Sequence, residues 1–154
     1  HVTVGYVSLR YTILANHYLA CYLGVGYMEN GMLIIGTILL LIIGITHSYL
    51  GEKYILIRLF RREDLPKLLG SDWFTKRVLR FAWHLTTLAW WGFAAILYVL
   101  STPSVNVQNE ILTIVAVVFI LSGIVSLLFS RGKHFSWLFF FIISATSYYG
   151  VTYS

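Results

Sequence analysis

Twenty consecutive residues, Gly31–Leu50, contain no charged side chain and are almost entirely apolar (GMLIIGTILLLIIGITHSYL). At a rise of about 1.5 Å per residue, a helix of this length spans about 30 Å, the thickness of the hydrocarbon core of a bilayer. A helix of a soluble domain keeps one polar face toward water, and this segment has none. The segment therefore predicts a transmembrane helix.

Three further segments are also long and mostly apolar, namely Val78–Leu100, which contains Arg80, Ile111–Phe129 and Phe135–Tyr153. Charged residues make up only 11% of the chain, whereas soluble domains contain about 25%. Of the 17 charged residues, 12 lie between Glu52 and Arg80, so the apolar segments are nearly free of charge. We expect an all-α fold in which residues 28–154 form a polytopic transmembrane four-helix bundle.

Residues 1–27 allow two interpretations. The apolar stretch Tyr11–Tyr27 has only 17 residues and contains Asn16 and His17, whereas a spanning helix needs about 20 apolar residues. No basic segment precedes it as in a secretory signal, and Met28 offers a natural start. The segment is either a weak fifth span or foreign to the native protein, and we expect it to be dispensable.

Basic residues are unevenly divided among the loops. Loop 51–77 holds seven of them and loop 130–134 holds two, whereas loop 101–109 has no charged residue. Loops rich in Lys and Arg stay on the cytoplasmic side of a membrane. We therefore expect loops 51–77 and 130–134 to be cytoplasmic and loop 101–109 to be external. The net charge of +5 then reflects contact of the first loop with anionic lipid headgroups, and we expect no nucleic-acid partner.

Polar side chains of the first two predicted spans share a face and a depth. On the first span they follow Gly44 at spacings of three and four, and on the second they follow Arg80 in the same way. Ionisable groups within a span are costly, so they usually face protein and have partners. The sequence predicts an intramembrane polar cluster with Glu52 paired to Arg80 or Arg58 and with the two histidines close together. We also expect a hydrogen bond from His47 to His84 or Thr87. Its members are His47, Glu52, Arg80, His84 and Thr87.

Three roles of this cluster stay open. It can link the first two spans, it can carry protons because histidine titrates near neutral pH, or it can bind a metal or haem through His47, His84 and His134. No H-x-x-x-H or C-x-x-C pair is present, so we expect neither a metal site nor another cofactor. Phosphate-loop, nucleophile-elbow and zinc-protease motifs are also absent from the sequence. We therefore expect no enzymatic activity and no catalytic residue.

These observations favour a non-enzymatic membrane protein, either an accessory subunit of a larger membrane complex or a self-assembling homo-oligomer. One alternative is a small proton-linked transporter or channel, with His47, Glu52 and His84 along the path. The second alternative is a metal- or haem-binding redox protein of the membrane.

Two short motifs carry a resemblance to known proteins. HSYLGE (His47–Glu52) and RFAWHLT (Arg80–Thr86), the latter followed by Trp90 and Trp91, resemble segments of small bacterial integral membrane proteins of uncharacterised function. The similar region covers less than a third of the chain. The resemblance implies a location in the bacterial cytoplasmic (inner) membrane, and it implies no activity.

Overall fold

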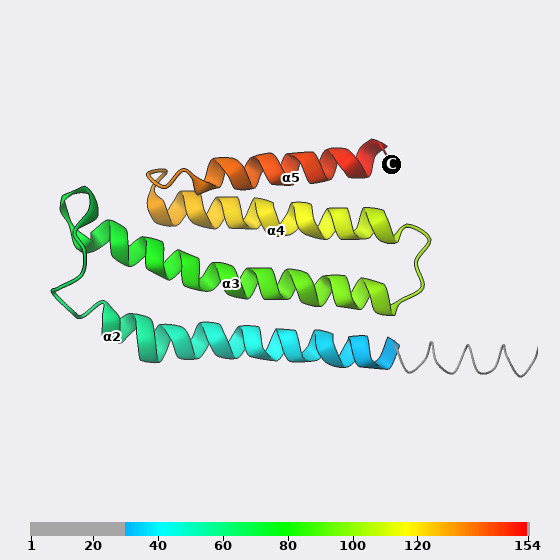
Figure 1. Ribbon diagram of the computed structural model, residues 1–154, viewed down its shortest axis with the longest axis horizontal. Coiled ribbons are helices and arrows are strands. Elements are labelled where there is room, and N and C mark those ends of the chain that lie inside the picture. The colour runs from blue at the N-terminus through cyan, green and yellow to red at the C-terminus, as the bar shows by residue number, and fades with distance from the viewer. Residues whose placement is uncertain (1–29, 154) are drawn as a thin grey trace, which may run out of the picture.

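The computed structural model describes residues 30–153, which form four helices and no strand (Figure 1). The first helix runs from Asn30 to Leu59 and ends in the π-helical segment η1 (Gly51–Leu56) and the short α2 (Ile57–Leu59). It is followed by α3 (Asp72–Ser101), α4 (Val107–Ser130) and α5 (Ser136–Tyr153). The predicted all-α fold with four helices is confirmed. The expectations for residues 1–27 lie outside the described residues.

Three of these helices are long and apolar enough to cross a membrane. The first helix, α3 and α4 contain 30, 30 and 24 residues, which correspond to lengths of about 45, 45 and 36 Å. Helix α5 has 18 residues and is not among the three, since hydroxyl and aromatic side chains make up much of its second half. Three of the four predicted spans are thus supported, and a spanning role of α5 stays a prediction.

The helices lie side by side in sequence order, each antiparallel to the one before it (Figure 1). Helix α3 packs between the first helix and α4, and α4 packs between α3 and α5. The four helices therefore form an open layer, and both broad faces of this layer are left to the surroundings. The first helix and α5 are its two edges.

Small residues stand where neighbouring helices come closest. A Cβ atom added to Gly92 of α3 would lie 2.7 Å from Cγ2 of Val118, and one added to Gly123 of α4 would lie 2.5 Å from Cε1 of Phe141. In lipid, helices associate through such close contacts, because lipid tails solvate apolar side chains as well as protein does. The glycines therefore allow these two seams to form.

Serine side chains add hydrogen bonds to the seam between α4 and α5. The hydroxyl oxygens of Ser126 and Ser136 lie 2.6 Å apart, and the Ser144 hydroxyl donates to the Ala116 carbonyl at 2.8 Å. The serines that the sequence places at spacing four on α4, Ser122, Ser126 and Ser130, are buried. Their burial agrees with a packing stripe along α4.

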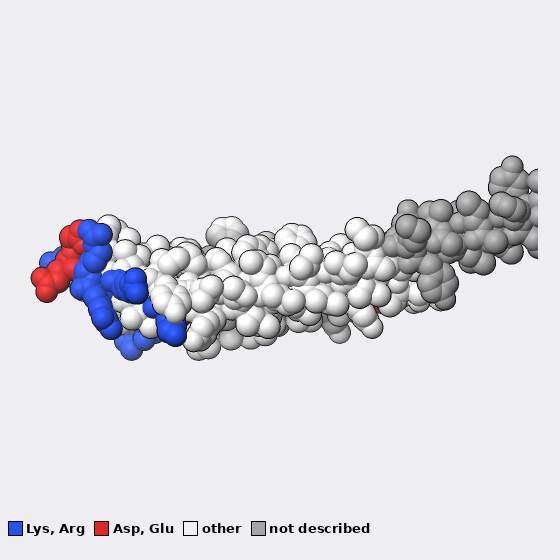
Figure 2. Space-filling view, turned by 90° about the horizontal axis from the view of Figure 1, so that it is seen from below, with Lys and Arg blue, Asp and Glu red and all other residues white. Residues whose placement is uncertain are grey.

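Charged side chains gather at one end of the layer, where the 60–71 loop and the 131–135 turn lie (Figure 2). The second loop, between α3 and α4, lies at the opposite end (Figure 1). This separation is the one that the loop charges predict. The assignment of the charged end to the cytoplasmic side stays a prediction.

Candidate functional site

A cluster of polar side chains joins the first helix to α3 near the charged end of the layer. Glu52 accepts a hydrogen bond from Nε of Arg80, with an Nε–Oε2 distance of 3.2 Å, and Nη2 of Arg80 lies 2.8 Å from Oε1 of Glu52 in an ion pair. A charge-assisted hydrogen bond together with a second close contact between the charged groups gives a strong arginine–carboxylate pair. Glu52 is therefore paired with Arg80, whereas Arg58 lies over the ring of Tyr54.

His84 extends this contact toward the middle of the layer. Its Nε2 atom lies 3.4 Å from Oε2 of Glu52, and its Nδ1 atom lies 2.7 Å from Oγ of Ser48. Ser48 Oγ is 3.1 Å from Oγ1 of Thr87, whose hydroxyl donates to the Gly44 carbonyl at 3.5 Å. Polar atoms thus follow one another from Glu52 to Gly44, along about 12 Å of helix.

His47 lies at the same seam but has other partners. Its ring stacks on the Trp83 indole with centroids 4.5 Å apart, and its Nε2 atom lies 3.0 Å from Oγ1 of Thr86. The Trp83 N–H donates to the His47 carbonyl at 3.2 Å. The expected hydrogen bond of His47 to His84 or Thr87 is wrong, because Ser48 occupies the position that faces His84.

The backbone of the first helix changes where the cluster forms. The segment η1 begins at Gly51 and has wider turns than an α-helix, a feature frequent at functional sites. Gly51 is buried beneath Trp83, and a Cβ atom there would lie 2.0 Å from the indole Nε1. The π-helical turn therefore starts where the chain must pass under Trp83 and direct Glu52 toward Arg80.

The buried polar atoms of the cluster have hydrogen-bond partners, whereas its charged side chains are partly exposed. In the described part of the chain, every buried side-chain nitrogen or oxygen has a hydrogen-bond partner. The side chains of Arg80, Glu52 and His84 nevertheless remain 37%, 31% and 32% exposed. The cluster can thus hold two helices together, while its ionisable groups keep some contact with the surroundings.

His134 lies apart from this cluster. Its Nδ1 atom is 2.7 Å from Oγ of Ser136, and its ring meets the ring of Phe81 with centroids 5.5 Å apart. Within residues 30–153, no three His, Cys, Asp or Glu side chains gather as a metal ion would require. The three histidines considered as metal ligands are therefore not brought together.

Sequence reasoning missed Ser48, Trp83 and Thr86 as members of the site. Ser48 is four residues from both Gly44 and Glu52, so the three share one helical stripe. This spacing could have identified Ser48 as a member of the site from the sequence. Trp83 and Thr86 are three residues apart, which places both against His47.

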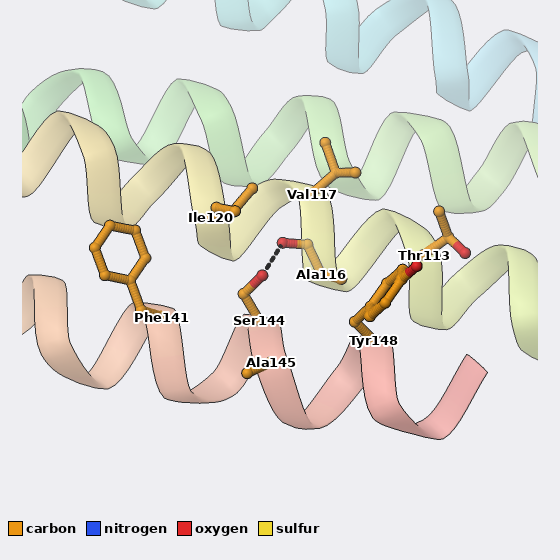
Figure 3. Close-up of a pocket in the computed structure, with 8 residues that line it drawn as sticks. All are labelled: Thr113, Ala116, Val117, Ile120, Phe141, Ser144, Ala145 and Tyr148. Atoms are coloured by element: carbon orange, nitrogen blue, oxygen red, sulfur yellow. Dashed lines mark hydrogen bonds between the residues drawn. The ribbon is translucent and has the colours of Figure 1, made fainter. Parts of the chain in front are cut away.

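A second feature is an apolar groove between α4 and α5 (Figure 3). It has a volume of about 420 Å³. The Ser144 hydroxyl is bonded to the Ala116 carbonyl, which leaves the groove nearly free of polar atoms. An apolar side chain or a lipid tail fits such a surface. The lining residues are Thr113, Ala116, Val117, Ile120, Phe141, Ser144, Ala145 and Tyr148.

Comparison of the chain with protein-family models, with curated proteins and with solved structures gives no match in any of the three. The resemblance of residues 47–91 to small bacterial integral membrane proteins therefore stays a prediction.

The link between His84 and Ser48 can be measured with a double-mutant cycle. Ser48→Ala and His84→Ala should each lower the free energy of unfolding in detergent by about 1 kcal/mol, and the double variant should lose about 0.6 kcal/mol less than the sum. Thr46→Ala serves as the control for Ser48→Ala, since the Thr46 hydroxyl bonds only within its own helix. Thr46→Ala and His84→Ala should be additive. Additivity of the Ser48 and His84 variants would contradict the link.

Proposed function

We propose that this chain is a non-enzymatic integral membrane protein that works as a self-assembling component, with identical copies joined edge to edge. The observation that carries this proposal is the open layer of four antiparallel helices (Figure 1). The edges of the layer, the first helix and α5, are the surfaces that a second copy would contact.

The layer buries little of its own apolar surface. In their most apolar stretches, only 11% of the residues of the first helix are buried, and only 22% of those of α3 and of α4. Large side chains remain about half exposed on both edges, including Leu39 and Ile42 of the first helix and Phe139 and Ile142 of α5. Apolar side chains exposed in this way can face either lipid or a neighbouring copy. The directions of the two edge helices also favour a neighbouring copy.

The two edges run in opposite directions. The first helix runs toward the charged end of the layer, and α5 runs away from it (Figure 1). A second copy with the same membrane orientation would therefore place its first helix antiparallel to α5, as at every seam within the chain. Contacts between two different surfaces repeat from copy to copy, and they close into a ring when the rotation between copies permits it.

The polar cluster and the groove support the same arrangement. Glu52 belongs to the edge helix and is paired with Arg80, and both side chains are about one-third exposed. A neighbouring copy at this edge would shield these charged groups from lipid, where their exposure is costly. Near the other edge, the groove between α4 and α5 offers room for a large apolar side chain of the copy on that side.

Cysteine cross-linking tests this edge-to-edge contact. Glu52 and His134 contact consecutive residues of α3, so they mark one level. Ile42 lies ten residues from Glu52, and Ile142 lies eight residues from His134, which corresponds to depths about 3 Å apart. Copies carrying Ile42→Cys and copies carrying Ile142→Cys, both with Cys21→Ser, should form disulfide-linked dimers in lipid vesicles upon oxidation.

The control pairs Ile42→Cys with Val105→Cys, because Val105 is fully exposed in the loop at the far end of the layer. This pair should give no cross-linked dimer. Absence of dimers with the first pair, together with a monomeric mass in lipid nanodiscs, would contradict self-assembly.

Proton-linked transport is a second candidate function, favoured by the position of His84 between Glu52 and Ser48. An imidazole bonded through both nitrogens can accept a proton on one and release it from the other. If this candidate holds, vesicles containing the protein should dissipate a pH gradient faster than empty vesicles, and His84→Gln should abolish the difference. Equal rates for wild-type protein and empty vesicles would reject it.

A further inference from the structure

Three cations surround one indole ring at the charged end of the layer. The Cζ atoms of Arg77 and Arg131 each lie 4.8 Å from the centroid of Trp73, and Nζ of Lys133 lies 5.9 Å from it. Any two of these charges are therefore at most about 11 Å apart, close to the screening length of about 8–10 Å in salt solution. The indole attracts each cation through its ring face, but it carries no charge that balances theirs.

No acid of the described part of the chain is paired with these three cations. Glu52 is paired with Arg80, Asp64 with Arg62, and Asp72 with Lys76. The pair with Arg62 also holds the pKa of Asp64 below its usual range, so this carboxylate stays charged and engaged. The cluster of Arg77, Arg131 and Lys133 thus remains a concentration of positive charge that an external anion can neutralise.

A hollow beside this cluster has one charged and one apolar wall. It has a volume of about 290 Å³ and is lined by Arg77, Arg80, Leu128 and Phe129. Arg77 donates a hydrogen bond to the Phe129 carbonyl at 3.5 Å, which holds its guanidinium at the end of α4. A molecule that fills the hollow would meet guanidinium groups at one side and apolar side chains at the other.

We propose that these residues bind the phosphate of an anionic phospholipid, with Arg77, Arg131 and Lys133 around the phosphate and an acyl chain against Leu128. Basic pockets between membrane helices on the cytoplasmic side are suited to such headgroups. Trp73 belongs at this level, because tryptophan is enriched at the boundary between lipid and water. The site joins α3 to the α4–α5 turn, and its hollow shares Arg80 with the polar cluster at the first helix.

Native mass spectrometry of the full chain in neutral detergent tests this proposal. Phosphatidylglycerol should be retained at concentrations at least about tenfold lower than phosphatidylcholine. Removal of two of the charges, by Arg131→Asn with Lys133→Gln, should weaken phosphatidylglycerol retention about tenfold or more. Asparagine is chosen because Arg131 has a left-handed backbone with φ of 52°, a conformation that asparagine tolerates.

The matched control, Arg61→Gln with Lys67→Gln, removes the same charge from exposed positions of the nearby loop. It should change phosphatidylglycerol retention less than twofold, and the charge-preserving Arg131→Lys should retain the lipid like wild type. Equal losses in both double variants, or a loss with Arg131→Lys, would overturn the proposal. Displacement of the lipid by an equal concentration of inorganic phosphate would also overturn it, since the site would then take free phosphate.

Discussion

In a bilayer, an apolar side chain gains little by leaving lipid for protein, so helices adhere only where they pack closely or exchange hydrogen bonds. Each seam between neighbouring helices has such a close contact at a glycine. Gly92 admits Val118, Gly123 admits Phe141, and Gly51 lies beneath Trp83. Each of these contacts connects helices that are neighbours in sequence, so the four described helices form a row (Figure 1).

The seam between the first helix and α3 contains an ion pair between the two helices. Glu52 and Arg80 pair near the charged end, and His84 connects this pair to Ser48. Charged groups need partners at such a depth, so the pair fixes how the edge helix is attached. The same end of the layer carries the cations around Trp73. Attachment of the edge helix and the proposed binding of lipid headgroups therefore depend on residues at the same end of the layer.

Much of this structure follows from the sequence in a direct way. Uncharged apolar stretches locate the helices, and spacings of three and four along α3 place Arg80, His84 and Thr87 toward the first helix. The partner of His84 was missed, because the choice between His47 and Ser48 depends on a small rotation of the first helix. The π-helical segment at Gly51 affects that rotation, and no simple pattern of residue types predicts it. The arrangement of the four helices in an open layer could not be predicted from the sequence either, since lipid can cover any apolar face that protein leaves free.

The open layer is the central claim, and one distance within a single chain tests it most directly. Spin labels at positions 42 and 142, in a Cys21→Ser background and diluted with unlabelled protein, report the separation of the two edge helices by pulsed electron resonance. Three interhelical spacings of about 8–10 Å each separate these edges in a row, so the account predicts a distance of about 25–30 Å. A distance below about 15 Å would show that the first helix and α5 meet in a closed bundle, and it would contradict the open layer.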